Sequence, residues 1–259
     1  MAQEGPQAMA GVPAAGAARC RYTRRDDPRH FRVRPAARGC AVNGLPDPGE
    51  RRRLTIDGEA GDIECALSAP RGREPVGALL VCHPHPLYGG TMDNKVVTTL
   101  AAAAHDAGMA AMRFNFRGVG GSGGAHDEGR GEARDCVLLA QWLREQLGDR
   151  PLALAGFSFG GFVALAAQAV IAPAALITVA PAVAYFGEQG VPAWPRMPWL
   201  CIHARDDDVV SLEENRARLA SADSAPRWEI PEQAGHFFHG RLELVRDPAR
   251  ALLETLSAA

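Results

Sequence analysis

The sequence predicts an α/β fold in which a mostly parallel central sheet of about eight strands is flanked by helices. Short apolar runs alternate with helix-like segments from residue 51 onward. Several of these runs are almost continuously apolar, which is typical of parallel strands buried on both faces. Polar clusters follow several runs at the points where strands would end. Because ligands bind beyond the carboxyl ends of such strands, we expect the functional residues there.

The strands and helices are predicted in a regular order. Residues 53–56 and 63–67 alternate in polarity like an antiparallel pair joined by a glycine-containing turn. Further strands are expected at 76–82, 110–115, 152–155, 174–180, 199–203 and 227–230. Helices are expected at 94–107, 128–147, after residue 158, at 212–220 and at 241–256, with Gly108 and Gly148 ending the first two.

The first 50 residues differ in composition from the rest of the chain. They are rich in Ala, Gly, Pro and Arg and show no hydrophobic periodicity. Such a segment cannot bury enough apolar area to offset its ordering entropy. We therefore expect residues 1–50 to be disordered and residues 51–259 to form a single domain. A start at a downstream non-Met codon is an alternative, since no methionine lies between Met9 and Met92.

Charge and cysteine content narrow the class of protein. The net charge of −2 argues against recruitment of nucleic acid or of an anionic membrane. No apolar stretch approaches the length of a membrane-spanning helix, and no secretory signal is recognisable at the N-terminus. The six cysteines form no Cys-x-x-Cys pair, which favours structural thiols in a reducing compartment. We expect a cytoplasmic monomer or homodimer with no nucleic-acid or membrane partner.

One serine stands at a predicted strand–helix junction. The motif Gly-Phe-Ser-Phe-Gly at residues 156–160 follows the apolar run 151–155 and precedes a helix-like run. Its glycines allow a tight turn that exposes the serine at the apex. The N–H of the next residue then opens a helix N-terminus, where negative charge is favoured. Ser158 is therefore the candidate nucleophile, and the Phe159 N–H is the candidate first oxyanion donor.

A serine nucleophile needs a base, and the base needs an acid to orient it. His236 lies between the last predicted strand and the last predicted helix, whereas His239 sits where that helix would begin. His236 is therefore the preferred base. Three adjacent aspartates, residues 206–208, follow the strand at 199–203. We select Asp207 as the acid because Val210 would anchor its loop to the core, and we expect at least two of the three to lie in a solvated turn.

The order Ser158, Asp207, His236, with the glycine-flanked serine, resembles the α/β-hydrolase fold. The resemblance extends from about Arg53 to the C-terminus and includes the glycine-rich run 113–122, which is typical of a turn after a strand. The segment His-Pro-His-Pro-Leu-Tyr-Gly-Gly-Thr-Met-Asp-Asn at 83–94 is similar to small bacterial serine hydrolases related to dienelactone hydrolases. True dienelactone hydrolases carry a cysteine nucleophile, so a lactone substrate is not implied for this serine.

The resemblance places the second oxyanion donor in the loop 83–90. Pro84 and Pro86 have no N–H and cannot donate. The donor is expected to be the N–H of Leu87, or alternatively that of His85. Two histidines in this loop suggest a metal, but no further cluster of ligands supports one, so neither metal nor cofactor is predicted.

The spacing of the three catalytic candidates leaves no room for a large helical cap. Only the Pro- and aromatic-rich segment 185–198 is available to shade the pocket. We name Tyr185, Phe186 and Trp194, together with Tyr88, as candidate substrate-pocket residues. Ordinary surface cover is an equally good interpretation of these side chains.

These residues predict a serine hydrolase that acts on carboxylic esters or thioesters of small to medium acyl chain through an acyl-enzyme. Its partner would be a small-molecule ester or thioester. An acyltransferase or a peptidase would use the same triad. A non-catalytic binding protein that kept the fold is an alternative from a different class.

Overall fold

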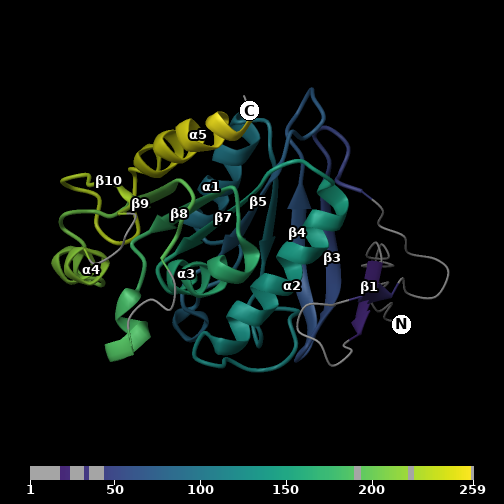
Figure 1. The fold of residues 1–259 in the computed structure, drawn as a ribbon, viewed down its shortest axis with the longest axis horizontal. Helices are drawn as coiled ribbons and strands as arrows, with labels where there is room; N and C mark the ends of the chain where they lie inside the picture. Colours follow the sequence, from purple (N-terminus) through teal and green to yellow (C-terminus); the bar gives the residue numbers. More distant parts are fainter. Residues whose placement is uncertain (1–17, 24–31, 35–43, 190–193, 221–224, 258–259) are drawn as a thin grey trace, which may run out of the picture.

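The computed structural model describes residues 18–23, 32–34, 44–189, 194–220 and 225–257. Within them, ten strands form one sheet (Figure 1) in the order β10-β9-β8-β7-β5-β6-β4-β3-β1-β2. The strands are β1 Ala18–Thr23, β2 Arg32–Arg34, β3 Arg51–Gly58, β4 Gly61–Ser68, β5 Ala78–Cys82, β6 Ala110–Phe114, β7 Leu152–Phe157, β8 Ala175–Val179, β9 Trp199–Ile202 and β10 Arg227–Glu229.

Most of the sheet is parallel, as the sequence predicts. Strands β5 to β10 pair in parallel, whereas β4 runs antiparallel to both β3 and β6. The predicted antiparallel pair is therefore β3 with β4. Each strand from β3 to β10 coincides with a predicted strand to within a few residues. The fold class is confirmed.

Helices cover the two faces of the sheet. They are α1 Lys95–Asp106, α2 Arg130–Leu147, α3 Phe159–Ile171, α4 Leu212–Leu219 and α5 Glu243–Ser257, with the short 3-10 helices η1 Pro86–Tyr88 and η2 Val183–Gln189. Side chains of α2 and α3 pack into one hydrophobic core, and those of α1 and α5 pack into a second core on the opposite face. Figure 1 shows α2 and α5 on opposite sides of the strands. Both faces of the parallel strands are thus buried, which explains their continuous apolar sequences.

The segment 1–50 lies largely outside the described residues, so the prediction that it is disordered mostly stays a prediction. The structure does give two short strands within it. Strand β1 pairs in parallel with β3, and β2 pairs with β1.

The carboxyl edge of the sheet carries no large cap over the described residues. Between β8 and β9 these residues include only η2 and a short extended stretch from residue 194. The loops after β5, β7 and β9 therefore come together with little above them. Among the described residues, none of the helices is long and apolar enough to cross a membrane.

Glycines permit a close approach of backbone segments at the turn between β7 and α3. A Cβ on Gly156 would meet the carbonyl of Gly160. A Cβ on Gly160 would meet the carbonyls of Cys82 and His83, at the end of β5. This turn is therefore packed against the neighbouring strand with no space for a side chain.

We predict that Gly160→Ala lowers the free energy of unfolding by about 3 kcal/mol, because backbone rather than a flexible side chain must move. Urea denaturation monitored by circular dichroism measures the change. Gly72→Ala is the matched control, because no atom lies within 4 Å of the added Cβ. Its cost comes only from the backbone strain of an alanine at a φ of +76°. It should cost only about 1 kcal/mol. Equal losses in the two variants would contradict the close approach.

Candidate active site

Ser158 stands at the apex of the turn between β7 and α3. Its φ is +55°, a conformation that residues other than glycine rarely adopt. The strained backbone is held on both sides: the Ser158 N–H donates to Val179 O at 2.9 Å, and its carbonyl accepts from Gly161 N at 2.9 Å and Ala182 N at 3.1 Å. Such strain at a helix N-terminus is typical of a nucleophile presented by a tight turn.

The structure brings Ser158, His236 and Asp207 together. His236 Nε2 lies 3.1 Å from Ser158 Oγ, and His236 Nδ1 lies 2.8 Å from Asp207 Oδ2. The His236 ring is nearly buried, with Phe157 on one side. This arrangement can take a proton from the serine hydroxyl while the carboxylate holds the imidazole in one tautomer.

The Asp207 carboxylate is fixed from several directions. Its Oδ1 accepts hydrogen bonds from Val209 N at 2.9 Å and Val210 N at 2.8 Å. Burial alone would raise the pKa of Asp207, but the hydrogen bonds from His203, His236 and the Val210 N–H lower it well below its usual range. The carboxylate is therefore ionised and oriented before any substrate binds.

A second histidine, His203, lies behind the carboxylate and was missed by sequence reasoning. It is fully buried; its Nε2 lies 3.0 Å from Val210 O and 3.4 Å from Asp207 Oδ2. Its Nδ1 lies 3.2 Å from Asn215 Nδ2, so Nε2 carries the donating hydrogen. Its position, four residues before Asp207 at the end of a predicted strand, is the sequence signal that could have identified it.

Asp206 has a role that the sequence did not reveal. Its Oδ1 accepts from Ala234 N and Gly235 N, both at 3.0 Å, so it holds the loop that carries His236. Hydrogen bonds from these two N–H groups lower the pKa of Asp206. Asp206 is exposed in a turn, as expected for two of the three aspartates, and it also holds this loop. Asp208 is exposed.

The two candidates for the second oxyanion donor differ in their surroundings. The Leu87 N–H donates to His85 Nδ1 at 3.2 Å, and the Leu87 side chain is 69% exposed. Among the described residues, the His85 N–H donates no backbone hydrogen bond. The His85 ring packs 4.7 Å from the Phe159 ring. The structure therefore favours His85, the alternative, over Leu87.

Aromatic side chains gather beside the nucleophile. The Tyr185 ring lies 5.5 Å from that of Phe159, and Tyr88 lies 4.8 Å from His85. Tyr88 and Tyr185 are exposed, so both are accessible to a ligand at this edge. Phe186 and Trp194 are instead partly buried against the core, in contacts typical of surface cover.

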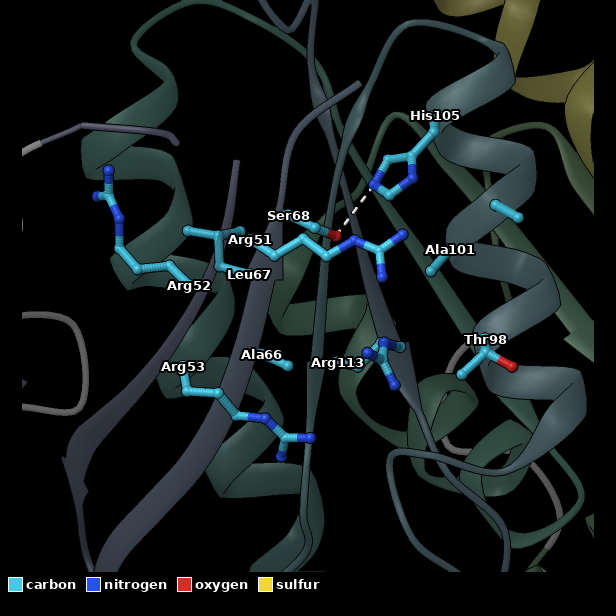
Figure 2. A pocket seen from close by; sticks show the side chains of 11 residues that line it. Arg51, Arg52, Arg53, Ala66, Leu67, Ser68, Thr98, Ala101, His105 and Arg113 are labelled. Carbon is cyan, nitrogen blue, oxygen red and sulfur yellow. Dashed lines mark hydrogen bonds between the residues drawn. The ribbon is translucent and has the colours of Figure 1, made fainter. Parts of the chain in front are cut away.

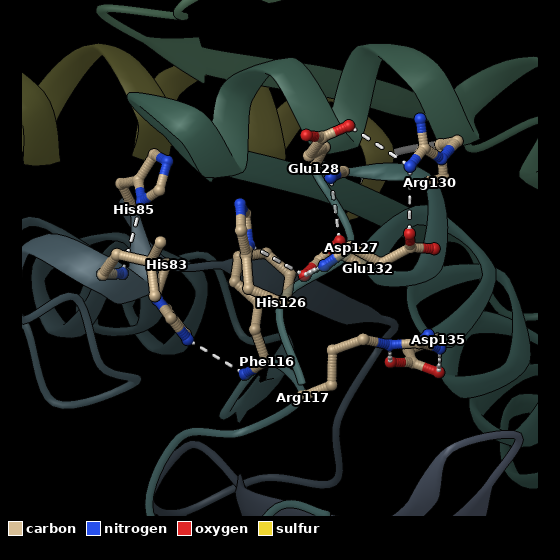
Figure 3. A network of polar contacts seen from close by, with 12 residues as sticks. His83, His85, Phe116, Arg117, His126, Asp127, Glu128, Arg130, Glu132 and Asp135 are labelled. Carbon is tan, nitrogen blue, oxygen red and sulfur yellow. Dashed lines mark hydrogen bonds and ion pairs between the residues drawn. The ribbon is translucent and has the colours of Figure 1, made fainter. Parts of the chain in front are cut away.

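Hydrogen bonds of a buried histidine shape the loop after β5. Figure 3 shows His83 beside Phe116. The His83 Nδ1–H donates to Pro84 O at 2.6 Å, and its Nε2 accepts from Phe116 N at 2.9 Å. Burial lowers the pKa of His83 from 6.5 to about 4, although the bond to Pro84 opposes the shift. This side chain is therefore a neutral structural element.

A buried polar network supports the same edge of the sheet (Figure 3). Glu132 is fully buried and accepts from Asp127 N, Gly129 N and His126 Nδ1 at 2.9–3.1 Å. The His126 ring lies 5.4 Å from that of Phe159. Sequence reasoning missed both residues, although Glu132 stands in the first turn of a predicted helix, where a carboxylate commonly caps.

A buried ion pair fixes the loop after β6. Arg117 donates to both carboxylate oxygens of Asp135 on α2 at 2.7 Å. Burial raises the pKa of Asp135, and the guanidinium only partly offsets the shift. The glycine-rich run 113–122 is thus held as a structural turn, as the sequence predicts.

Neither metal ligands nor disulfides stand out in the described part of the chain. Its His, Cys, Asp and Glu side chains form no group of three that could hold a metal ion. Cys65, Cys82, Cys136 and Cys201 are buried free thiols. Desolvation raises the pKa of Cys65, Cys82 and Cys201, so these thiols resist ionisation. The side chains of Cys20 and Cys40 lie outside the described part.

A family model matches most of the domain that carries this site. The model is described as X-Pro dipeptidyl-peptidase (S15 family), and it matches residues 57–251. The chain belongs to the S15 family. The range of this S15 chain that the family model matches includes the three candidate catalytic residues, Ser158, Asp207 and His236.

Two bacterial structures share the fold of this S15 chain at substantial identity. An α/β serine hydrolase homologue from Coxiella burnetii is 38% identical, with a TM-score of 0.73 over 82% of this chain and 99% of that chain. An α/β serine hydrolase from Xanthomonas campestris, described as having no lid, is 35% identical, with a TM-score of 0.72 over 83% and 97%. These likenesses confirm the predicted α/β-hydrolase superfamily.

Two of the curated relatives are uncharacterized proteins. An uncharacterized protein of Rickettsia prowazekii is 40% identical over 115 residues, which are 44% of this chain and only 48% of that relative's length. An uncharacterized protein of Mycobacterium tuberculosis is 28% identical over 233 residues, covering 72% of this chain and 80% of its own. The names of these two relatives give no substrate.

We predict that acid weakens folding through His83. Between about pH 6.5 and pH 4 the unfolded chain binds a proton at this residue that the folded protein does not. The free energy of unfolding should therefore fall by about 3 kcal/mol from this residue alone as the pH falls through that window. Urea denaturation at several pH values tests this, with His83→Gln as the comparison. That variant should show a correspondingly flatter dependence, and an unchanged slope would contradict the assignment.

We also predict that Asp206→Ala impairs catalysis without removing a catalytic group. Loss of the two hydrogen bonds that Asp206 Oδ1 accepts frees the His236 loop, so kcat/KM for a short p-nitrophenyl ester should fall roughly tenfold to a hundredfold. The matched control is Asp208→Ala, which removes an exposed neighbouring carboxylate and should keep the wild-type value. Similar losses of kcat/KM in both variants would show that the negative charge near the site, rather than the position of the His236 loop, determines the rate.

Proposed function

We propose that this protein is a serine hydrolase of carboxylic esters or thioesters. The hydrogen-bonded series Ser158–His236–Asp207, with distances of 3.1 and 2.8 Å, is the observation that carries the proposal. The three side chains come from loops at the carboxyl ends of β7, β10 and β9, where α/β sheets bind ligands. Membership of a hydrolase family supports the same class of reaction.

The proposed reaction passes through an acyl-enzyme. His236 Nε2 accepts the hydroxyl proton as Ser158 Oγ bonds to the carbonyl carbon, and the carbonyl oxygen becomes an oxyanion. When the tetrahedral intermediate collapses, the bond to the leaving alcohol or thiol breaks and His236 protonates that group. Water then gives a proton to His236 as its oxygen bonds to the acyl carbon. When the second intermediate collapses, the bond from the acyl carbon to Ser158 Oγ breaks, the carboxylic acid leaves, and His236 returns the proton to Ser158 Oγ.

The oxyanion would be held by the N–H groups of Phe159 and His85. Phe159 is the first residue of α3, so its N–H has no partner within the helix and adds the positive end of the helix dipole. Each such donor is worth roughly 3 kcal/mol of transition-state stabilisation.

A small or medium acyl chain suits the site better than a long lipid. The described residues between β8 and β9 form no large cap that would shelter a long apolar chain. The exposed rings of Tyr88 and Tyr185 offer a short aromatic wall beside Phe159. A location in the cytoplasm belongs to the same proposal, and the buried free thiols support it.

Peptide cleavage is the second candidate, because the matched family is described by an X-Pro dipeptidyl-peptidase activity. The same triad would serve either reaction. A panel of p-nitrophenyl esters and acyl thioesters of varied chain length, set beside Ala-Pro-p-nitroanilide, separates the two. Added alcohols or amines in the ester assay would reveal acyl transfer as new products.

We predict that Ser158→Ala abolishes both labelling by a fluorophosphonate and hydrolysis of short p-nitrophenyl esters, since no other group replaces the nucleophile. Ser211→Ala is the matched control, because it removes an exposed hydroxyl at the start of α4. That variant should label and turn over like the wild type. Undiminished turnover by Ser158→Ala would sink the proposal, and wild-type protein that fails to label would favour a non-catalytic binding protein.

A further inference from the structure

Two adjoining pockets lie beside α1, away from the proposed triad. The first has a volume of about 300 Å³ and is bordered by β3, β4, β6 and α1. The second has a volume of about 370 Å³ and shares Arg51, Ala102 and His105 with the first. Neither is lined by a residue of the triad or of the aromatic wall around Phe159. Figure 2 shows the first pocket with its arginines extended from the strands toward the helix.

The pairing of the strands places three arginines on one face of the sheet. Arg51 and Arg53 are two residues apart on β3, so they point to the same side. Arg53 pairs with Ala66 of β4, and Ala66 pairs with Arg113 of β6. The side chains of Arg51, Arg53 and Arg113 therefore converge on the same pocket (Figure 2), whereas Arg52 points away.

Carboxylates neutralise some of these arginines. Arg53 pairs with Glu64 and Asp93, each at 3.2 Å, and Arg113 pairs with Asp93 at 2.6 Å. Two carboxylates thus balance two guanidinium groups. These pairs hold Arg53 and Arg113 in place at the edge of the pocket.

Two further arginines are paired outside that set. Arg52 pairs with Glu50 at 2.7 Å, and Arg246 pairs with Asp106 at 2.6 Å. Of the arginines that line the two pockets, Arg51 and Arg71 alone have no carboxylate within ion-pair distance in the described part of the chain. Both line the second pocket. Two uncompensated positive charges therefore share one concave surface.

The rest of the lining is suited to a small organic molecule. Ala101 and Ala102 of α1, with Ala66 of β4, provide an apolar wall. His105 donates from Nε2 to Ser68 Oγ at 3.0 Å, because the Ser68 hydroxyl itself donates to Ala111 O. The His105 ring is thereby fixed at the junction of the two pockets.

We propose that these pockets form a second binding site, which takes a small molecule carrying a phosphate monoester. Arg51 and Arg71 contact the phosphate, and the organic part lies along the alanine wall of α1. Two guanidinium groups match the two negative charges of a phosphate monoester, and the planar fork of arginine fits its oxygens in a bidentate manner. The site is independent of the proposed hydrolase reaction.

Isothermal titration of the full chain with phenyl phosphate tests this proposal. At about pH 8 the phosphate carries two negative charges, whereas phenyl sulfate carries one and serves as the matched ligand. We expect phenyl phosphate to bind about tenfold more tightly than phenyl sulfate. Arg51→Gln and Arg71→Gln should each weaken phenyl phosphate binding about tenfold. Arg250→Gln, which removes an exposed arginine of α5 outside both pockets, should bind as the wild type does.

Three results would overturn the proposal. These are no binding of phenyl phosphate by the wild type, equal affinity for phenyl phosphate and phenyl sulfate, and unchanged binding in both pocket variants. Circular dichroism melts of each variant show whether a loss of binding reflects loss of folding. Hydrolysis of p-nitrophenyl acetate by Arg51→Gln should equal that of the wild type, which separates failure at this site from failure of the triad.

Discussion

The close backbone approach at the turn between β7 and α3 is the constraint on which the rest of the candidate site depends. Gly160 has no side chain because the carbonyls of Cys82 and His83 occupy the space that a Cβ would need. The same approach brings the loop after β5 beside the N-terminus of α3. The candidate nucleophile and both candidate oxyanion donors are therefore positioned by one packing contact. Because backbone atoms make this contact, it is rigid, and we expect it to shift little when a substrate binds.

Hydrogen bonds to backbone N–H groups place the other two members of the triad. Asp207 accepts from its own loop, and His203 contacts it from the buried side. Asp206 reaches across to the neighbouring loop and fixes Gly235, one residue before His236. Adjacent aspartates thus divide two tasks, one orienting the imidazole directly and the other holding the loop that carries it. Two members of the acidic run after β9 therefore have separate roles in the site.

Much of the fold and of the candidate site could be predicted from the sequence, because the sequence patterns that indicate them are local. Continuous apolar runs predicted the strands, and a serine between glycines marked the turn before α3. The contact of the Leu87 N–H is local but depends on a side-chain rotamer, whereas the geometry behind Asp206 and Arg51 is not local. Whether the Leu87 N–H is engaged depends on the rotamer of His85, and the role of Asp206 depends on a loop 28 residues away. The arginine pocket arises only when β3, β4 and β6 are paired in register, which the spacing along the chain does not reveal.

A crystal structure of the protein after reaction with a fluorophosphonate tests the central claim most directly. The account predicts phosphorus bonded to Ser158 Oγ, with His236 Nε2 facing the leaving-group side. It also predicts the phosphoryl oxygen at about 2.7–3.1 Å from the N–H nitrogens of Phe159 and His85. Attachment at another residue would contradict the assignment of the nucleophile. A phosphoryl oxygen bound by the Leu87 N–H, with His85 turned away, would contradict the arrangement of the oxyanion donors.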